Sequence, residues 1–453
     1  MTNAHSPKYI VFLVSPSLGV VDNVAPVLIK LREKYPQAKA IGFFPRPSVL
    51  RQVQTNPSLL RKLELCTDYI GFNAFGISET MLFPTADFFI ETRLASHFDN
   101  VPGWMGRIPV IYRIFVAFLN LFYCHNLKTK KIKSSVMFAP RTSMLIGDFG
   151  EVEKPYMSCI RQVATRTPFF GINHGVDVDL RTEFSPGQYY NLFLNRHCFL
   201  FSQRETEYYL NRFGLSLSEL SVVGVQKHDE QWLSWMGTPC MSVGSDSSQL
   251  TDEVLLISRP SGSEYLPSRR KEKALQVIRD KVIKKFRYKL LVKLHPKETD
   301  KKIFESIFGR DTQGKAWDFT NQSMDCISLR PVFAISFYSG LSTDLIRFGV
   351  PVIEYLDLEG LPGIEALGAK RMDDGSLALS YKANGLVLPA ATSEELQFAI
   401  DRIRDERHLV LAHLESSYNN LFDSPNGSVT RTVETIERIY KNLRENNRGI
   451  YNV

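Results

Sequence analysis

Short apolar runs alternate with amphipathic stretches along most of the chain. The first run, Tyr9 to Ser15, precedes a helical pattern from Asn23 to Lys34. The runs Ser143 to Asp148 and Phe169 to Ile172 predict strands that are buried on both faces of a parallel sheet. Strands that alternate with helices in this order predict the α/β class, with doubly wound, Rossmann-like sheets.

The same alternation continues to the end of the sequence. Further strands are predicted at Ala40–Phe44, Phe88–Glu91, Phe199–Ser202, Ser221–Gly224, Val254–Ser258, Leu290–Leu294, Val332–Ser336, Pro351–Tyr355 and Gly385–Leu388. Further helices are predicted at Lys154–Thr165, Glu205–Phe213, Arg269–Phe286, Ser393–Arg407 and Val429–Arg444. A stretch rich in Gly, Ser and Pro predicts a linker over residues 237–252. We therefore expect one domain over residues 1–236 and a second over residues 253–453.

Length and composition agree with two globular domains. The 453 residues exceed one usual hydrophobic core, and 44% hydrophobic with 23% charged residues is ordinary for a folded protein. The 6 cysteines form no Cys-x-x-Cys pair, which argues against a disulfide framework or a zinc site and favours a reducing compartment. The polar start, Met1 to Lys8, leads directly into the first strand and does not have the pattern of a signal peptide. A cytoplasmic location is therefore expected.

The net charge of +7 favours an acidic partner, such as a nucleotide or an anionic lipid surface. No standard nucleic-acid-binding module is present, so we expect no nucleic acid partner. The apolar stretch Ile108–Cys124 is followed by a basic cluster at Lys128, Lys130, Lys131 and Lys133. Residues 108–133 fit an interfacial helix at the inner face of the plasma membrane, or equally a buried helix with a solvated basic turn.

A histidine ends the run that starts at Leu290. His295 falls at the carboxyl end of a predicted parallel strand, the edge at which open α/β sheets bind ligands. An imidazole there can bond a leaving phosphate, and Pro296 and Lys297 follow it directly. The alternative is a strand that simply stops at a proline.

About 45 residues later, a loop rich in hydroxyl groups follows the strand that ends at Ser336. Its residues Ser339, Gly340, Ser342 and Thr343 suit an anion, although one hydroxyl could serve as an ordinary helix cap. Glu354 ends the next strand, where it would bond a nucleotide sugar or face water. His295 and this loop together predict one donor-binding site on one sheet edge.

His174 is the general-base candidate, because an imidazole can take a proton from an acceptor hydroxyl near neutral pH. Asp148 could orient it or act as the base instead, and a structural histidine is the alternative. The chain lacks a P-loop, a Gly-x-Ser-x-Gly elbow and a Gly-x-Gly-x-x-Gly fingerprint. No histidine spacing indicates a metal, so neither a metal nor a cofactor is predicted.

These motifs resemble a known group of enzymes. They are similar to the His-Pro and Ser motifs of GT-B-fold transferases that build bacterial surface polymers. The matching stretches are Val-Lys-Leu-His295-Pro296, Ser336 to Asp344, and Phe-Gly-Val-Pro-Val-Ile-Glu354. The group includes CDP-glycerol glycerophosphotransferases and CMP-sialic acid or CMP-Kdo transferases. Ile146-Gly-Asp148 and Gly171-Ile-Asn-His174-Gly175 resemble the glycerophosphotransferase branch, whose histidine is the proposed base.

The resemblance implies two Rossmann-like domains that face a central cleft. It implies an N-terminal domain that binds a glycan or lipid-linked glycan acceptor, and a C-terminal domain that binds a cytidine-activated donor. His295 with the Ser339 to Thr343 loop would bind the nucleotide phosphate, in a metal-independent glycosyl or polyol-phosphate transfer for capsule, lipopolysaccharide or teichoic acid-like polymers. Two alternatives stay open: a UDP-sugar glycosyltransferase or UDP-GlcNAc 2-epimerase of the same fold, and a non-catalytic GT-B module in polymer assembly.

Overall fold

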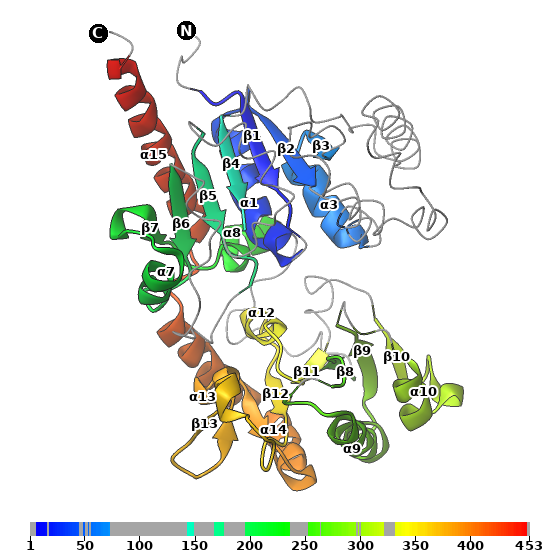
Figure 1. Cartoon of the computed structure of the whole chain (residues 1–453). Coiled ribbons are helices and arrows are strands. Elements are labelled where there is room, and N and C mark those ends of the chain that lie inside the picture. The colour runs from blue at the N-terminus through cyan, green and yellow to red at the C-terminus, as the bar shows by residue number, and fades with distance from the viewer. Residues whose placement is uncertain are drawn as a thin grey trace, which may run out of the picture. The chain divides into compact units, whose positions relative to one another are not determined.

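The computed structural model describes residues 6–15, 18–44, 49, 53, 56–72, 143–148, 167–175, 195–235, 252–262, 264–295, 298, 300–320 and 331–450. The chain folds into two compact units (Figure 1). Unit 1 comprises Met1–Gly175, Thr182–Asp229 and Pro425–Val453, and unit 2 comprises Val176–Arg181 and Glu230–Ser424. Each unit is built on its own parallel sheet.

In the described part of unit 1, a seven-stranded parallel sheet has the order β3-β2-β1-β4-β5-β6-β7. Its strands are β1 (Tyr9–Leu13), β2 (Lys39–Phe44), β3 (Tyr69–Phe72), β4 (Met144–Gly147), β5 (Phe169–Ile172), β6 (Arg196–Leu200) and β7 (Leu220–Val222). Its helices are α1 (Gly19–Lys34), α3 (Pro57–Cys66), α7 (Glu205–Phe213) and α15 (Ser428–Ile450), with short 3-10 turns at Leu217–Glu219 and Gln226–His228. The chain returns to the middle of the sheet after β3, so the strand order reverses between β1 and β4.

The core of unit 1 follows from the apolar strands. Every residue of β4 and β5 is buried, as is all of β1 except its first residue. Helix α1 buries one side of nearly its whole length, including Val20, Val24 and Leu28, and packs with α3 and α15. Central parallel strands covered by helices require such continuous apolar runs, which is why the sequence predicted them correctly.

The C-terminal helix α15 belongs to unit 1, although the sequence grouped residues 253–453 as one domain. Its first turn is tied by Asp229, whose carboxylate accepts the Val429 backbone N–H at 3.0 Å. Arg431 donates two bonds to the Val223 carbonyl, the closer at 2.7 Å. These buried and partly buried bonds fix the helix against the end of β7. No residue pattern within α15 itself could have shown this assignment.

In the described part of unit 2, a six-stranded parallel sheet has the order β10-β9-β8-β11-β12-β15. Its strands are β8 (Glu253–Ile257), β9 (Lys289–Lys293), β10 (Trp317–Phe319), β11 (Pro331–Ser336), β12 (Val352–Tyr355) and β15 (Leu388–Ala390), and a separate hairpin pairs β13 (Lys370–Arg371) with β14 (Leu377–Ala378). Its helices are α8 (Glu230–Trp235), α9 (Ser268–Ile278), α10 (Lys302–Phe308), α12 (Leu341–Arg347), α13 (Ser380–Ala383) and α14 (Ser393–Leu421), with a π-helical continuation of α9 at Arg279–Lys285 and 3-10 turns at Arg310–Thr312 and Glu365–Leu367. The strand order reverses between β8 and β11.

The structure confirms the predicted α/β class and its two doubly wound sheets. Some predicted bounds were wrong. Helix α1 begins four residues before Asn23, and the predicted strand at 385–388 is β15, which begins at Leu388. Helix α14 runs past Arg407 to Leu421, with non-helical backbone angles at Glu406. The strand predicted at 88–91, the helix at 154–165, the linker at 237–252 and the apolar segment 108–133 lie outside the described residues.

Candidate functional site

In unit 1, three neighbouring strands deliver polar side chains to one edge of the sheet. Ser15 follows β1, Asp148 follows β4, and His174 follows β5. Because β1, β4 and β5 are adjacent and parallel, these strand ends meet at one edge. That edge includes the point where the strand order reverses, the usual place for a ligand in an open α/β sheet.

Asp148 and His174 form a close pair. The Nδ1 atom of His174 lies 2.5 Å from Oδ2 of Asp148. The Asp148 carboxylate is completely buried, whereas 36% of the His174 side chain is exposed. Ser15 donates a longer bond of 3.5 Å to the same carboxylate oxygen. An ionised carboxylate only accepts hydrogen bonds, so this contact selects the imidazole tautomer that carries its proton on Nδ1.

In that tautomer Nε2 is the basic nitrogen of the ring. A histidine oriented by a buried carboxylate, with part of its ring exposed, has the arrangement of a general base that takes a proton from a hydroxyl. Asp148 contacts Nδ1 of His174, the contact through which a carboxylate could orient the ring. Burial of the carboxylate makes Asp148 itself the less accessible of the two.

Helix α1 holds the backbone of the His174 segment, which the sequence did not reveal. The amide group of the fully buried Asn23 donates to the Asn173 carbonyl at 2.9 Å and to the His174 carbonyl at 3.5 Å. A Cβ atom at Gly19 would lie 2.7 Å from the His174 carbonyl oxygen, so the close approach of helix and loop requires glycine there. Both residues follow β1 in the sequence, in the loop and helix that were interpreted only as a fold signature.

In unit 2, the predicted donor residues His295 and Ser339 follow strands β9 and β11, and Glu354 lies within β12. His295 lies two residues beyond β9, and Ser339 lies three residues beyond β11. Strands β9 and β11 both flank β8, so the two loops start from the same sheet edge at the reversal of strand order. Pro296 and Lys297, which were predicted to act with His295, lie outside the described residues.

The hydroxyl loop is arranged more locally than its sequence indicated. The half-buried Ser339 accepts a bond from the Leu341 backbone N–H at 3.3 Å, which closes a turn. Thr343 is fully buried and donates to the Gly340 carbonyl at 2.8 Å. Ser342 is also fully buried, and its hydroxyl oxygen has no hydrogen-bond partner among the described residues. Ser339 and the exposed Gly340 are therefore the parts of this loop that reach the surface.

An aromatic cluster supports the same loop. Tyr338 has a φ of 63°, a left-handed conformation that costs a non-glycine residue roughly 1 kcal/mol or more. Its hydroxyl group lies 2.7 Å from Ser380 Oγ, and its ring contacts those of Tyr265 and Tyr381. The Arg259 guanidinium lies 5.4 Å from the Tyr265 ring centre and 5.7 Å from that of Tyr338. Sequence reasoning missed this cluster, because only the turn after β11 brings its members together.

Glu354 is buried, so the alternative of a strand-end carboxylate facing water is wrong. Only 3% of the residue is exposed, and one carboxyl oxygen, Oε2, has no hydrogen-bond partner within the described part of the chain. Glu354 pairs in register with Ser336, whose buried hydroxyl also lacks a partner there. Burial raises the pKa of Glu354 to about 8, while the positive charge of Lys382 acts in the opposite direction.

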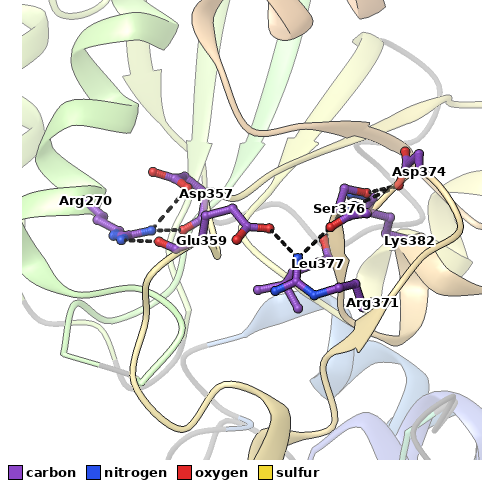
Figure 2. A network of polar contacts seen from close by, with 9 residues as sticks. Arg270, Asp357, Glu359, Arg371, Asp374, Ser376, Leu377 and Lys382 are labelled. Atoms are coloured by element: carbon purple, nitrogen blue, oxygen red, sulfur yellow. Dashed lines mark hydrogen bonds and ion pairs between the residues drawn. The ribbon is translucent and has the colours of Figure 1, made fainter.

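Lys382 belongs to a chain of polar contacts that orders the segment after β12 (Figure 2). Its ammonium group donates to Ser376 Oγ at 2.8 Å and to the Leu377 carbonyl at 3.0 Å. At the other end of the network, Arg270 donates to the Asp357 carbonyl at 2.5 Å and to the Glu359 carbonyl at 2.6 Å. The network thus holds in place Lys382, whose positive charge acts to lower the pKa of the Glu354 carboxyl.

Among the described residues, no group of three or more His, Cys, Asp and Glu side chains could hold a metal ion. No helix in these ranges is both long and apolar enough to cross a membrane.

The two doubly wound units define a GT-B fold, and solved structures of this class match nearly the whole chain. One is a UDP-GlcNAc 2-epimerase from Neisseria meningitidis bound to UDP-GlcNAc, with 12% identity and a TM-score of 0.52 over 95% of this chain and 100% of that chain. Another is a putative UDP-N-acetylglucosamine 2-epimerase from Listeria monocytogenes, with 11% identity and a TM-score of 0.54 over 96% of this chain and 98% of that chain. A variant of the wall teichoic acid polymerase TagF has 11% identity and a TM-score of 0.51 over 98% of this chain and 90% of that chain.

No protein-family model and no curated protein matches the sequence. At 11–12% identity, the likeness to solved structures establishes the fold. It confirms the GT-B architecture that the His-Pro and Ser motifs implied. The cytidine donor implied by the same motifs stays a prediction.

Proposed function

We propose that this protein is a transferase that moves a glycosyl or polyol-phosphate group from a cytidine-activated donor, of the CMP-sugar or CDP-glycerol type, to a glycan acceptor. The acceptor would belong to a surface polysaccharide such as capsule, lipopolysaccharide or a teichoic acid-like polymer. The observation that carries the proposal is the pair formed by the buried Asp148 and the partly exposed His174 at the strand ends of unit 1. Such a pair suits deprotonation of a hydroxyl, which is the step that an acceptor glycan requires.

In the proposed reaction, Nε2 of His174 takes the proton from the acceptor hydroxyl. The resulting oxygen attacks the sugar carbon of a CMP-sugar or the glycerol-bearing phosphorus of CDP-glycerol. The bond from that atom to the nucleotide phosphate oxygen breaks, and the leaving CMP keeps the electron pair. Asp148 stabilises the imidazolium that forms, as a buried carboxylate does beside a histidine base.

Unit 2 is assigned the donor in this proposal. His295 and the Ser339 turn would bond the nucleotide phosphate and offset the charge that develops on it as it leaves. Glu354 is assigned to a sugar hydroxyl of the nucleotide, because its buried carboxyl group, with a pKa raised to about 8 by burial, is protonated near neutral pH and can donate or accept a hydrogen bond. No step in this scheme calls for a metal ion.

A second candidate, a UDP-GlcNAc 2-epimerase, is favoured by a specific observation. The structure from Neisseria meningitidis that shares the fold carries that activity in its name and holds UDP-GlcNAc. An epimerase would bind UDP-GlcNAc and change one stereocentre without transferring the sugar. The identity of the bound nucleotide therefore separates the two candidates.

The test is a thermal-shift panel with CMP, CDP, UDP, GDP and ADP on the full chain. A nucleotide at roughly a hundred times its dissociation constant should add about 2.7 kcal/mol of stability. Stabilisation by CMP or CDP alone would support the cytidine-donor proposal, and transfer from CDP-glycerol, CMP-Kdo and CMP-sialic acid would be assayed next. Stabilisation by UDP alone would replace it with a UDP-sugar enzyme, either the epimerase or a glycosyltransferase, and a silent panel would favour a non-catalytic module.

A further inference from the structure

A buried lysine in the first turn of α9 joins two strand-end loops of unit 2. Only 1% of Lys271 is exposed, and its ammonium group contacts the Glu298 carboxylate and donates to the Arg259 carbonyl at 2.6 Å. Ser258 donates to the same Glu298 oxygen at 3.1 Å. Arg259 lies in the loop after β8, and Glu298 lies in the loop after β9. One side chain thus fixes the positions of both loops.

Glu298 also bonds back to the backbone of His295. Its backbone N–H donates to the His295 carbonyl at 2.8 Å. The Glu298 residue is only 8% exposed, and its second carboxylate oxygen, Oε2, is buried without a hydrogen-bond partner in the described part of the chain. The position of His295 is therefore linked through one turn to a carboxylate that points inward.

Stability alone gives no reason for this arrangement. Removing two charges from water costs about as much as their attraction returns, so an apolar pair of equal volume commonly stabilises a fold equally well. The buried oxygen without a partner adds a further cost. An apolar pair could not, however, direct bonds from one ammonium group to two separate loops.

We propose that Lys271 and Glu298 are positioning residues, which hold the His295 and Arg259 loops in the arrangement that binds the phosphate of the nucleotide donor. The inference rests on the proposed function, since it takes unit 2 as the donor-binding unit. It adds two residues that touch neither the donor nor the reacting atoms.

The neighbouring residue on α9 extends the same role to a third loop. Arg270 donates to the carbonyls of Asp357 and Glu359, which follow β12 and the Glu354 carboxyl (Figure 2). Two consecutive basic residues therefore tie the loops after β8, β9 and β12 to one helix. The first is partly exposed, whereas Lys271 is buried, so the Lys271–Glu298 pair is the stronger test.

The test compares the wild type with the double variant Lys271→Met/Glu298→Leu, which replaces the buried pair by apolar residues of similar size. The control is Lys273→Met/Glu272→Leu, which removes the same charges from two exposed positions of α9. Three quantities are measured on the full chain: the melting temperature without ligand, hydrogen exchange at the Glu298 amide, and the dissociation constants of CMP, CDP and UDP. Where transfer is measurable, kcat and KM are added.

The pair variant should melt within about 5 °C of the wild type. Its Glu298 amide should exchange about tenfold faster, because the turn opens locally. The nucleotide bound by the wild type should bind the pair variant about tenfold to a hundredfold more weakly, since loss of position costs binding. The control should match the wild type in all three measurements.

Unchanged exchange at Glu298, or unchanged nucleotide affinity, would overturn the positioning role. If the double variant does not fold, Glu298→Gln serves instead, because it keeps the volume and one acceptor oxygen while it removes the charge. It should weaken nucleotide binding in the same direction, and wild-type affinity in this variant would also overturn the role. A wild type that binds none of the nucleotides would refute the proposed function itself, and the role of the pair with it.

Discussion

The two units position their candidate site residues in different ways. Both place candidate residues where the strand order of a parallel sheet reverses. In unit 1, the candidate base His174 is held by its short contact with Asp148 and by the bonds that Asn23 donates to its backbone segment. In unit 2, a buried ion pair, an arginine network and a tyrosine with left-handed backbone angles fix the loops after the strands.

The difference follows from how far each residue lies from its strand. Asp148 and His174 are one and two residues beyond β4 and β5, so the sheet itself positions them. In unit 2, His295 is also two residues beyond its strand, but Ser339 and Glu298 are three and five residues beyond β11 and β9, where side-chain contacts must supply what the sheet does not. Substitutions should therefore act on chemistry in unit 1, and on ligand affinity and local stability in unit 2.

The largest effect on activity is expected from substitution of His174, the candidate base in unit 1. His174→Gln should lower kcat of the proposed transfer by about a hundredfold to ten-thousandfold, which is the usual contribution of a general base. The dissociation constant of the nucleotide should stay unchanged, because unit 2 is intact. A transfer assay with thermal shifts on the same samples checks both. The exposed His408 on α14, changed to Gln, is the control; equal activity of His174→Gln and wild type would remove His174 from the mechanism.

The next effect is a pH dependence of stability that arises from Glu354 in unit 2. Burial raises the pKa of Glu354 to about 8 from its ordinary value of 4.5, so between these values the folded chain holds a proton that the unfolded chain has lost. Stability should therefore fall as pH rises from about 4.5 to about 8, by up to about 5 kcal/mol, and fall no further from this group above that range.

Glu354→Gln removes this titration while it keeps the size of the side chain. The difference in melting temperature between the variant and the wild type should grow in favour of the variant from pH 5 to pH 8.5. The exposed Glu365, changed to Gln, should follow the wild type across the same range. Parallel curves for Glu354→Gln and wild type would show that the Glu354 carboxyl has no raised pKa.

A smaller effect is expected at the donor phosphate. His295→Ala should weaken binding of the preferred nucleotide about tenfold to a hundredfold, because a hydrogen bond to a charged group contributes about 1.5–3 kcal/mol. Calorimetric titration measures it, and the unliganded melting temperature serves as the check on folding. If the nucleotide bound the variant and the wild type with equal affinity, His295 would be a structural residue. The His-Pro resemblance would then no longer support a donor site in this chain.

The smallest effect concerns the polar network after β12. Arg270→Gln removes bonds to two backbone carbonyls and should lower the free energy of unfolding by about 1 kcal/mol, measured by denaturant titration. Arg269, the exposed neighbour, gives the matched Arg269→Gln control. If the free energy of unfolding fell by several kcal/mol instead, the network would stabilise the fold of unit 2 as a whole and not only the loop after β12.

The sequence supported the prediction of those features that depend on apolar runs and on strand ends. It placed Asp148, His174 and His295 just beyond the ends of strands, and the structure has them there, whereas Glu354 lies inside β12 and is buried. The reason is physical: a buried parallel strand must be continuously apolar, so its first polar residue marks the edge of the sheet.

The residues that the sequence did not reveal act across long distances in the chain. Asn23 bonds a carbonyl 150 residues away, and Lys271 bonds a carboxylate 27 residues away. Gly19 is required by a carbonyl that belongs to another strand's loop. Such roles depend on which strands are neighbours, and the strand order is not written in any local pattern. The burial of Ser342 and Thr343 likewise follows from how α12 packs on the sheet.

The position of α15 has a consequence for how the protein is made. Unit 1 is discontinuous, and the whole of Glu230–Ser424 is synthesised before the ribosome reaches the helix that packs on α1. While a chain grows at about 5–20 residues per second, unit 1 therefore waits about ten seconds or more with the α1 surface uncovered. Unit 2 has no such wait, because all of its described strands and helices lie within Glu230–Ser424. During synthesis, the N-terminal half is thus the later of the two to mature.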